Sequence, residues 1–410
     1  MCAARELPEQ IPYFKREELS VSDFQCGDII IDALLGIGFT GTSVRGSCAS
    51  FIRAANSSGN MIVALDVPSG VDASTGIAAE TAVRASYTIM FGAVKSGLLE
   101  DAALPYCGVL RFADIGFDLP ESSGIECYTQ FEAYQDIARV DCNAHKNSRP
   151  SVLIFAGCRN YSGAAQLNMH AALRAGAGMV RLVTSAEKPA YPLAGIIFNS
   201  SSEDDAVYPA DAVRKNAGLF EKSDVLLAGS GWGYADKQLI TDVLKFKGPV
   251  VLDADALNAL SRDPDTWSYR SDAVLTPHYG EAVRLAGAFG VPVTSDRRQF
   301  ALALSEKLNC VVVLKGPHTI TAWCGRQLWI NTSGCSKLAT AGSGDVLAGV
   351  IASAVAGASC AEDICRRTAF AVWVHGVAGE ISANSLIADD LPLLVGRVMT
   401  FLAEKQIISL

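Results

Sequence analysis

Short apolar runs rich in β-branched residues alternate with longer amphipathic segments along most of this chain, and that alternation constrains the fold most. The expected strands of the longer series are 152–156, 179–183, 224–227, 249–252, 273–275 and 310–314, with helical segments between them. Strands that alternate with helices favour a mostly parallel sheet with helices on both faces. We therefore expect an α/β fold built on a doubly wound sheet.

A shorter series of the same kind comes first. Its expected strands are 28–35, 61–66, 87–91 and 109–112, with a helix at 44–57. Residues 118–149 show no strong apolar period. These changes divide the chain into a tail or remnant at 1–25, a first domain at 26–118, a linker at 119–144 and a second domain at 145–410. Near the end we expect a hairpin of 320–323 with 327–330, then helices at 345–356 and 364–381.

Composition narrows the class of protein. The 410 residues carry a net charge of −9, and their lysines and arginines are scattered, so no basic stripe suggests a nucleic-acid partner. No apolar run approaches the roughly 18 residues that span a bilayer, so we expect no membrane partner. The 12 cysteines form no C-x-x-C pair or zinc-spaced cluster, which fits a reducing compartment. We expect a cytoplasmic protein without an export signal.

One glycine-rich stretch is the strongest candidate for chemistry. Ala341-Gly-Ser-Gly-Asp345 leads into an apolar helical segment. Glycines allow backbone N–H groups to converge on an anion, and a helix start adds its positive end. The Asp345 carboxylate would then lie beside bound phosphate and could accept a proton from a substrate hydroxyl. The alternative is a glycine-rich turn with an aspartate as helix cap.

Other polar residues follow the expected strands. Gly229-Ser-Gly-Trp-Gly233 is a candidate binding loop, although such a pattern alone also fits an ordinary turn. Asp253 and Asp255 suit either a metal–phosphate site or helix capping, and the sequence does not choose between the two. Lys315 could pair with phosphate as a point charge, or simply be an exposed lysine at a strand end.

Two aspartates of the first domain also end strands and precede glycine loops. Asp32 precedes Gly36-Ile-Gly38, and Asp66 precedes Pro68-Ser-Gly70. Ligands of open α/β sheets bind outside the carboxyl ends of the strands, where these side chains fall. Both aspartates would alternatively be turn formers.

The second domain resembles the ADP/ATP-dependent NAD(P)H-hydrate dehydratases of the ribokinase-like superfamily. The resemblance rests on several motifs in order. They are His145-Lys146, Tyr161–Ala165, 229–233, Asp253-Ala-Asp-Ala-Leu-Asn258, Thr276-Pro-His-Tyr-Gly-Glu281, Leu314-Lys-Gly316 and Ala339-Thr-Ala-Gly-Ser-Gly-Asp345. Small departures occur, since the family usually has Gly-Pro-Gly-Leu-Gly at 229–233 and Gly or Met at Lys337. The resemblance implies a ribokinase-like fold.

The resemblance also implies roles for individual residues. Asp345 would be the catalytic base. The nucleotide-binding residues would be Lys315, Gly316, Pro317, His318, Thr319, Gly342, Ser343 and Gly344. The residues binding the hydrated dinucleotide would be Ala164, Ala165, Gly231, His278 and Asp345.

The first domain resembles the C-terminal half of NAD(P)H-hydrate epimerase domains, through residues 32–41 and 64–76. By this resemblance Asp32 and Ser69 would ligate K⁺. The hydrated cofactor would contact Gly36, Ile37, Gly38, Phe39, Thr40, Gly41, Thr42 and Asp66. Residues 1–27 show no match to the Asn-Asn-Gly-Gly-Asp-Gly phosphate loop of such epimerases, so we expect a partial, Rossmann-like half-domain with impaired epimerase activity.

Together these resemblances imply a bifunctional NAD(P)H-hydrate repair enzyme. The expected reaction phosphorylates the hydroxyl of the (6S) hydrate of NADH or NADPH from ADP, or from ATP, with Mg²⁺ carried by the nucleotide. Phosphate then leaves to restore the ring. Relatives of this kind form homo-oligomers, so we expect one here, with a tetramer as one form. Two alternatives remain: a ribokinase-like kinase of a small molecule such as a vitamin alcohol, and a non-catalytic nucleotide-binding protein.

Overall fold

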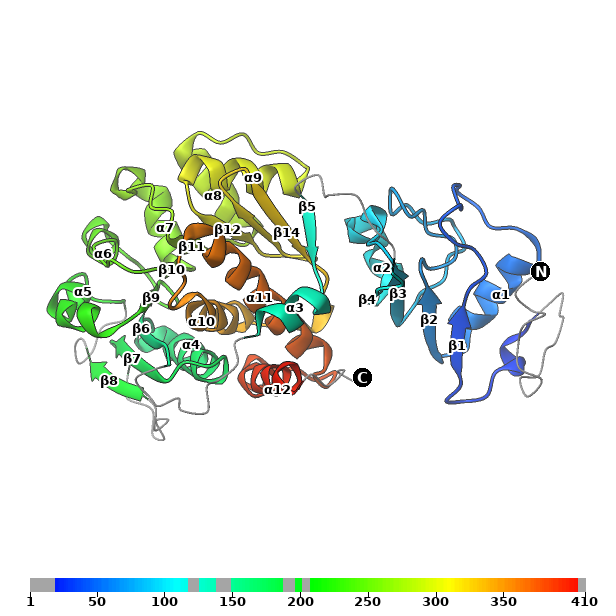
Figure 1. Ribbon diagram of the computed structural model, residues 1–410, viewed down its shortest axis with the longest axis horizontal. Helices are drawn as coiled ribbons and strands as arrows, with labels where there is room; N and C mark the ends of the chain where they lie inside the picture. The colour runs from blue at the N-terminus through cyan, green and yellow to red at the C-terminus, as the bar shows by residue number, and fades with distance from the viewer. Residues whose placement is uncertain (1–18, 117–124, 138–148, 187–195, 201–206, 405–410) are drawn as a thin grey trace. The chain divides into compact units, whose positions relative to one another are not determined.

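The computed structural model describes residues 19–116, 125–137, 149–186, 196–200 and 207–404. Contacts between residues divide the chain into two compact units, with the boundary between Asp118 and Leu119. Each unit has its own sheet (Figure 1). None of the helices in the described ranges combines the length and the apolar character needed to cross a bilayer.

The first unit is built on a four-stranded parallel sheet. Its strands lie in the order β1 (Ile29–Asp32), β2 (Met61–Leu65), β3 (Tyr87–Phe91) and β4 (Val109–Ala113). The helix α1 (Gly46–Ser57) connects β1 to β2, and the short α2 (Leu104–Cys107) precedes β4. Because all four strands run parallel, their carboxyl ends share one edge, where the loops after β1 and β2 lie.

The second unit contains a ten-stranded sheet in the order β5-β14-β13-β12-β11-β10-β9-β6-β7-β8. Neighbouring strands are parallel except that β13 is antiparallel to both β12 and β14. The strands are β5 (Ile125–Tyr128), β6 (Ser151–Phe155), β7 (Met179–Thr184), β8 (Ile196–Ser200), β9 (Val225–Ala228), β10 (Val250–Leu252), β11 (Ala273–Leu275), β12 (Val311–Leu314), β13 (Ile320–Trp323) and β14 (Gln327–Asn331).

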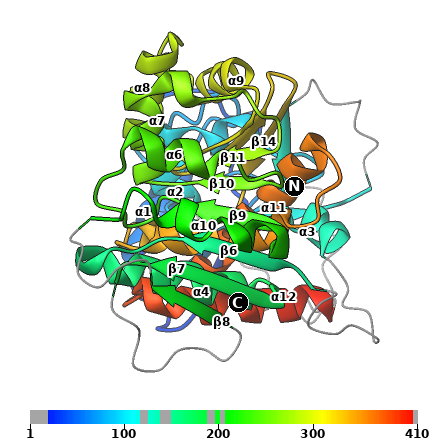
Figure 2. The ribbon, with the colours of Figure 1, turned by 90° about the vertical axis from the view of Figure 1, so that its left-hand side faces the viewer.

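Helices cover both faces of this sheet (Figures 1 and 2). On one face α4 (Ser162–Arg174), α10 (Ser343–Val355), α11 (Ala361–Glu380) and α12 (Leu391–Ala403) pack against one another, and α3 (Gln130–Asp136) packs on α11. The remaining helices form the other layer, in which consecutive helices pack in pairs. They are α5 (Ala212–Lys215), α6 (Lys237–Val243), α7 (Asp255–Arg262), α8 (Tyr279–Phe289) and α9 (Arg297–Leu308).

The central strands are apolar without interruption because both faces are covered. All four residues of β12 and all four of β9 are buried. The helix α10 is buried along most of its length, between the sheet and α4. The expected α/β fold with a mostly parallel, doubly wound sheet is therefore confirmed.

The order of the sheet reverses between β6 and β9, because the chain runs outward from β6 to β8 and then returns to add β9 to β12. In open α/β sheets this reversal point is where ligands bind, outside the carboxyl ends of the strands. The topology alone therefore directs attention to the loops that follow β6 and β9.

The interval 119–144, which the sequence suggested as a linker, differs from that expectation because it contributes to the second unit. Its strand β5 pairs with β14 at the edge of the sheet, and α3 follows at once. Thr129 caps α3 together with Glu132, whose carboxylate accepts from the Thr129 N–H at 2.7 Å. An edge strand and a two-turn helix need few apolar residues, so this interval shows no apolar periodicity from which they could be predicted. The strand β8 and the helix α12 were likewise not anticipated.

The close packing of α10 on α4 yields a prediction about stability. A Cβ on Gly349 would lie 2.3 Å from the carbonyl oxygen of Asn168 and 2.9 Å from the Cβ of Ala171. We expect Gly349→Ala to separate the two helices and lower the free energy of unfolding by about 1–3 kcal/mol or more. The matched control is Gly287→Ala on α8, where a Cβ meets nothing within 4 Å. That change should stabilise the protein by up to about 1 kcal/mol through helix propensity. Urea unfolding followed by circular dichroism measures both, and equal effects would contradict the packing argument.

Candidate active site

The start of α10 forms the centre of the candidate site. Gly342 precedes the helix with φ of 90°, and a Cβ there would lie 2.5 Å from Leu167 and 2.9 Å from Ala388. Only glycine accepts both this conformation and this crowding. Ser343, Gly344 and Asp345 then form the first turn, whose N–H groups have no partner within the helix. The geometry suits an anion held at the helix start.

The Asp345 side chain is suited to accept a proton near neutral pH. Burial, and after it the nearby Asp253 and Asp255 carboxylates, raise the pKa of the Asp345 carboxyl to about 7. A hydrogen bond with Ser230 and the charge of Lys315 act in the opposite direction. A carboxylate whose pKa is close to the working pH is an efficient general base.

Lys315 extends from the end of β12 into the same site. Its Nζ lies 2.9 Å from Asp253 Oδ1 and 3.9 Å from Glu281 Oε2. Burial alone would lower the pKa of Lys315, but the two carboxylates outweigh burial and raise it, so the ammonium stays charged. A Cβ on Gly344 would lie only 3.4 Å from this Nζ. The positive charge therefore lies directly beside the helix start, where a phosphate would bind.

The loop after Lys315 holds the other residues expected to bind nucleotide. Gly316 has φ of 153°, and a Cβ there would meet the Arg297 guanidinium at 2.5 Å. Arg297 donates to the carbonyl of Pro317 at 2.6 Å, and Thr319 donates from its hydroxyl to the carbonyl of Gly316 at 2.9 Å. His318 Nδ1 lies 3.2 Å from the carbonyl oxygen of Asn331. Through Lys315, the structure brings this loop next to Gly344.

The glycine loops after β6 and β9 meet at the reversal point of the sheet. Gly157 N–H donates to the Ser230 carbonyl at 2.9 Å, and Cys158 N–H donates to that of Gly231 at 2.8 Å. A Cβ on Gly231 would lie 2.9 Å from both Tyr161 and Ala164. A Cβ on Gly157 would likewise lie only 2.7 Å from the Cβ of Ala165. Three residues expected to bind the hydrated dinucleotide, Ala164, Ala165 and Gly231, are therefore neighbours.

His278 caps α8 and also borders Lys315. The ring Nδ1 of His278 accepts from the Gly280 N–H at 3.0 Å, and the backbone N–H of His278 donates to Glu281 Oε2 at 2.8 Å. The Lys315 N–H donates to the Pro277 carbonyl at 2.9 Å, which fixes the two segments together. His278 thus caps the helix, and its side chain remains 56 % exposed beside the Lys315 network.

Sequence reasoning missed two buried residues under this site. His375 on α11 lies with its Nε2 3.2 Å from the Ser343 hydroxyl, and burial lowers the pKa of His375 to about 4, which keeps it neutral. Asn168 on α4 donates to the backbone carbonyl of Asp345 at 2.7 Å. A histidine or an asparagine within an otherwise apolar helix was the available signal, but its partner lies far away along the chain.

The segment before Gly342 is fastened to α11. Ser333 donates from its hydroxyl to the Trp373 carbonyl at 2.9 Å, and Gly334 N–H donates to Glu380 Oε1 at 2.7 Å. Lys337, one of the departures from the family pattern, donates to the Glu380 carbonyl at 3.0 Å. This lysine therefore acts within the structure and does not reach toward the anion position.

In the first unit the two expected K⁺ ligands lie together. Ser69 donates from its N–H to Asp32 Oδ2 at 2.8 Å and from its hydroxyl to Oδ1 at 2.6 Å. The Ser69 hydroxyl also lies 3.2 Å from the carbonyl oxygen of Leu35. Oxygen donors of this kind suit a hard monovalent cation.

Asp66 adopts φ of 71° just after β2, a conformation that non-glycine residues seldom adopt. Its carboxylate accepts from the Phe91 N–H at 3.0 Å and pairs with the Lys95 ammonium. Lys95 was not singled out from the sequence. The loop from Gly36 to Thr42 follows β1, next to β2 in the sheet, so it and Asp66 occupy the same edge. Much of that loop is exposed, including Ile37.

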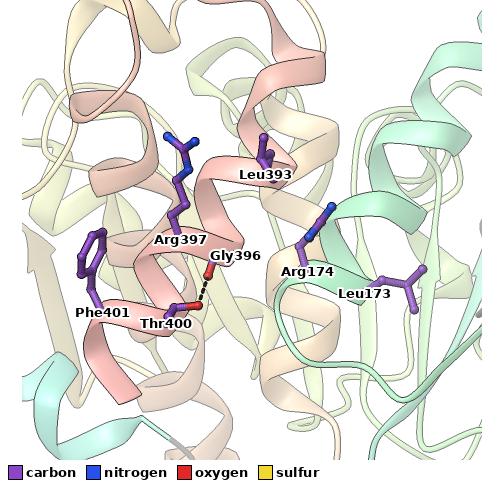
Figure 3. A pocket seen from close by; sticks show the side chains of 7 residues that line it. All are labelled: Leu173, Arg174, Leu393, Gly396, Arg397, Thr400 and Phe401. Atoms are coloured by element: carbon purple, nitrogen blue, oxygen red, sulfur yellow. Dashed lines mark hydrogen bonds between the residues drawn. The ribbon is translucent and has the colours of Figure 1, made fainter. Parts of the chain in front are cut away.

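Several features lie apart from these residues. The His145-Lys146 pair falls outside the described residues. Among the residues that are described, no three His, Cys, Asp or Glu side chains are arranged to hold a metal ion. A surface pocket of about 420 Å³ lies between the end of α4 and α12 (Figure 3). Its lining contains none of the expected site residues; it consists of Leu173, Arg174, Leu393, Gly396, Arg397, Thr400 and Phe401.

Comparison with known proteins gives two family matches. The family model described as NAD(P)H-hydrate dehydratase matches residues 152–399. The model described as YjeF-related protein N-terminus matches residues 3–97, which includes most of the stretch assigned above to a tail or remnant.

Individual relatives agree with the family models. A bifunctional NAD(P)H-hydrate repair enzyme Nnr of Thermofilum pendens is 34% identical over 387 residues, which cover 92% of this chain and 71% of that protein. An ADP/ATP-dependent NAD(P)H-hydrate dehydratase of Bacillus subtilis, crystallised with ATP and Mg²⁺, is 26% identical with a TM-score of 0.55, over 68% of this chain and 100% of that one. A ribokinase-like protein of Enterococcus faecalis, 21% identical, shares the fold with a TM-score of 0.59, over 70% and 100% of the two chains.

The raised pKa of Asp345 predicts how stability depends on pH. Since the folded pKa is about 7 and the ordinary value 3.8, the unfolded chain loses this proton first as the pH rises. Stability contributed by the protonated carboxyl is therefore full below pH about 4 and is lost by pH about 7. We expect Asp345→Asn to raise the free energy of unfolding by on the order of 3 kcal/mol at pH 8 and hardly at all at pH 3.5.

The control for this measurement is Asp389→Asn, which changes an exposed carboxylate. Urea unfolding of the wild type, Asp345→Asn and Asp389→Asn at pH 8 and at pH 3.5 measures the predicted difference in stability. A variant at position 345 that is no more stable than the wild type at pH 8 would mean that Asp345 is ionised in the folded protein at little cost.

Proposed function

The chain belongs to the NAD(P)H-hydrate dehydratase family, and on this premise we propose that its second unit dehydrates the (6S) hydrates of NADH and NADPH with ADP, or ATP, as phosphoryl donor. One observation supports the proposal most directly. A partly buried carboxyl group, Asp345, with a pKa close to neutrality lies in the first turn of α10, beside the ammonium of Lys315. A proton acceptor next to an anion site is what transfer of phosphate to a hydroxyl group requires.

In the first step the substrate hydroxyl attacks the terminal phosphorus of the nucleotide. A phosphorus–oxygen bond forms to the substrate, and the one to the departing nucleotide breaks. The hydroxyl proton goes to the Asp345 carboxylate. The Ala164, Ala165 and Gly231 backbones, which lie together at the reversal point of the sheet, would hold the hydrated ring against Asp345.

Charge on the transferred group falls at the start of α10. The N–H groups of Gly342 and Gly344 would donate to its oxygens, as would that of Ser343 on leaving its 3.3 Å hydrogen bond to the Thr340 carbonyl, and Lys315 would add a full positive charge. The loop from Gly316 to Thr319 would hold the adenylate. No cage of carboxylates occurs among the described residues, so Mg²⁺ would be held mainly by the nucleotide phosphates. Magnesium bound there neutralises phosphate charge.

In the second step the nicotinamide ring expels the phosphate. The lone pair of the ring nitrogen pushes out the phosphate with its bonding electrons, and the neighbouring ring carbon then loses a proton. The carbon–carbon double bond is restored, and the net change is the loss of water from the hydrate and the hydrolysis of one phosphoanhydride. Phosphorylation turns a poor leaving group into a good one, which is why a kinase-like site can serve a dehydratase.

We propose a more limited role for the first unit. Asp32, Ser69 and the Leu35 carbonyl offer oxygens for K⁺, and Asp66 with the loop from Gly36 to Thr42 would face the hydrated cofactor. These 410 residues contain no match to the phosphate loop of the family, and we propose that by themselves they epimerise only weakly. We further propose that the protein acts in the cytoplasm as a homo-oligomer, for which a tetramer is one form.

The assigned role of Asp345 predicts a loss of turnover without a loss of binding. Asp345→Asn should keep nucleotide affinity, measured by calorimetry, and lower kcat by about 10²- to 10⁴-fold, because no proton acceptor remains. In the wild type, kcat/KM should rise with pH through about 7 as the carboxylate forms. Recovery of absorbance at the reduced-nicotinamide band measures both. Asp389→Asn should behave as wild type, and normal turnover by Asp345→Asn would remove this residue as the base.

The two units can be tested together with a mixture of both hydrate epimers, ADP or ATP, and Mg²⁺. We expect the S fraction to be restored quickly and the R fraction only at its spontaneous rate of epimerisation, in K⁺ or in Na⁺. Rapid recovery of both fractions, faster in K⁺, would show that the first unit epimerises. Absence of recovery, with a stable phosphorylated product from another alcohol, would favour a ribokinase-like kinase instead.

A further inference from the structure

The side chain of Lys337 links the segment before Gly342 to the end of α11. Lys337 belongs to a single 3₁₀ turn, Ser336–Leu338, which lies shortly before Gly342. Its Nζ donates to the Glu380 carbonyl at 3.0 Å and to the Ser382 carbonyl at 2.7 Å. The ammonium is therefore engaged on the backbone at the end of α11, and none of the steps proposed so far uses it.

The end of α11 is a place where an ammonium group is favoured. The last carbonyls of a helix have no N–H partner within the helix and carry the negative end of its dipole. Glu380 is the final residue of α11, and Ser382 follows shortly after it. An ammonium group has three hydrogens, so it can donate to both carbonyls at once. Lys337 thus supplies this helix end with a cation that belongs to the chain itself.

The segment approaches α11 so closely that the helix has glycines where the two touch. A Cβ on Gly379 would lie 2.5 Å from Leu338 Cγ, and one on Gly376 would clash with Ser333 Oγ. Residues at this spacing lie on the same face of a helix. The segment from 333 to 338 therefore lies along one face of α11, and it is hydrogen-bonded to the helix near both of its ends.

This contact bears on the anion position because little of the chain separates the two. After the turn that contains Lys337, no strand or helix intervenes before Gly342, which immediately precedes α10. Asp345 is held in another way, since α10 packs on α4 and Asn168 of α4 donates to the Asp345 carbonyl at 2.7 Å. Loosening the segment should therefore displace the N–H groups that receive phosphate and leave the base in place.

We propose that Lys337 is a positioning residue whose ammonium, acting as a built-in cation at the end of α11, holds the segment so that the N–H groups of Gly342 and Gly344 meet the nucleotide phosphate. The inference rests on the dehydratase function proposed above. Lys337 itself would touch neither the nucleotide nor the hydrate. The glycine or methionine that the family usually has here carries no charge, so it could not fasten the segment in this way. An uncharged residue would leave the two carbonyls open to a small cation from solution.

The first test is Lys337→Met in the full-length protein, which keeps an unbranched side chain and removes the charge. Loss of the two hydrogen bonds from a charged group should raise the KM for ADP about tenfold and leave kcat and the KM for the hydrate within about twofold of wild type. A merely structural role would lower the amount of active protein, and so kcat, with the KM for ADP unchanged. That result would overturn the proposal. The matched control is Lys307→Met, in the last turn of α9, where the lysine is exposed; it should behave as wild type.

A second variant, Lys337→Ala, removes the whole side chain and tests whether the ammonium group itself is needed. Ethylammonium chloride should return the KM for ADP to within about threefold of wild type, because an ammonium group can then donate to the same two carbonyls. Tetramethylammonium chloride at the same concentration has the same charge but no N–H to donate, so it should not restore the KM. Equal effects of the two salts would contradict the proposal.

Calorimetry separates this inference from the dehydratase proposal, because binding does not need turnover. A wild type that binds ADP with Mg²⁺ but does not restore the hydrate, while Lys337→Met binds ADP about tenfold more weakly, would overturn only the dehydratase function. Equal affinities of the two proteins for ADP would overturn the role of Lys337. Absence of nucleotide binding by the wild type would overturn both.

Discussion

The ion pair between Lys315 and Asp253 is the interaction on which the candidate site depends. It ties the end of β12 to the end of β10, and Thr276, which follows the intervening β11, donates to the same carboxylate oxygen at 2.6 Å. Both side chains of the pair are largely removed from water. A buried charge that lost its partner would cost roughly 3–5 kcal/mol, so each partner fixes the other. The positive charge at the anion position follows from this arrangement, whereas the pKa of Asp345 is raised first by burial and then by Asp253, with Lys315 acting in the opposite direction.

Much of this arrangement could be predicted from the sequence, for a physical reason. Parallel strands share a carboxyl edge, so residues that directly follow strands, such as Asp253, His278 and Lys315, must gather there once the alternation of strands and helices is recognised. The need for glycine in the loops could also be predicted from the sequence. The requirement for glycine at Gly342 comes from its own backbone conformation, and a glycine followed by a polar residue and a helix announces that requirement locally.

The rest could not be predicted, because it depends on contacts between segments far apart in the chain. His375 lies 32 positions from Ser343, and Asn168 lies 177 positions from Asp345. Nothing near either residue shows what it will contact. The strand β5 is a similar case, since its register with β14 places it in the sheet and its own composition does not.

The two units contrast in how they hold their carboxylates. In the second unit Asp345 is partly buried, and burial raises its pKa to about 7 while the charge of Lys315 favours the ionised form. In the first unit β1 is an edge strand, and Ile29 and Ile31 remain 62% and 56% exposed. Asp32 is nevertheless buried, because Ser69 satisfies both of its oxygens through local hydrogen bonds. Asp32 therefore keeps its geometry through its immediate partner, whereas the chemistry of Asp345 requires the packing of the whole second unit.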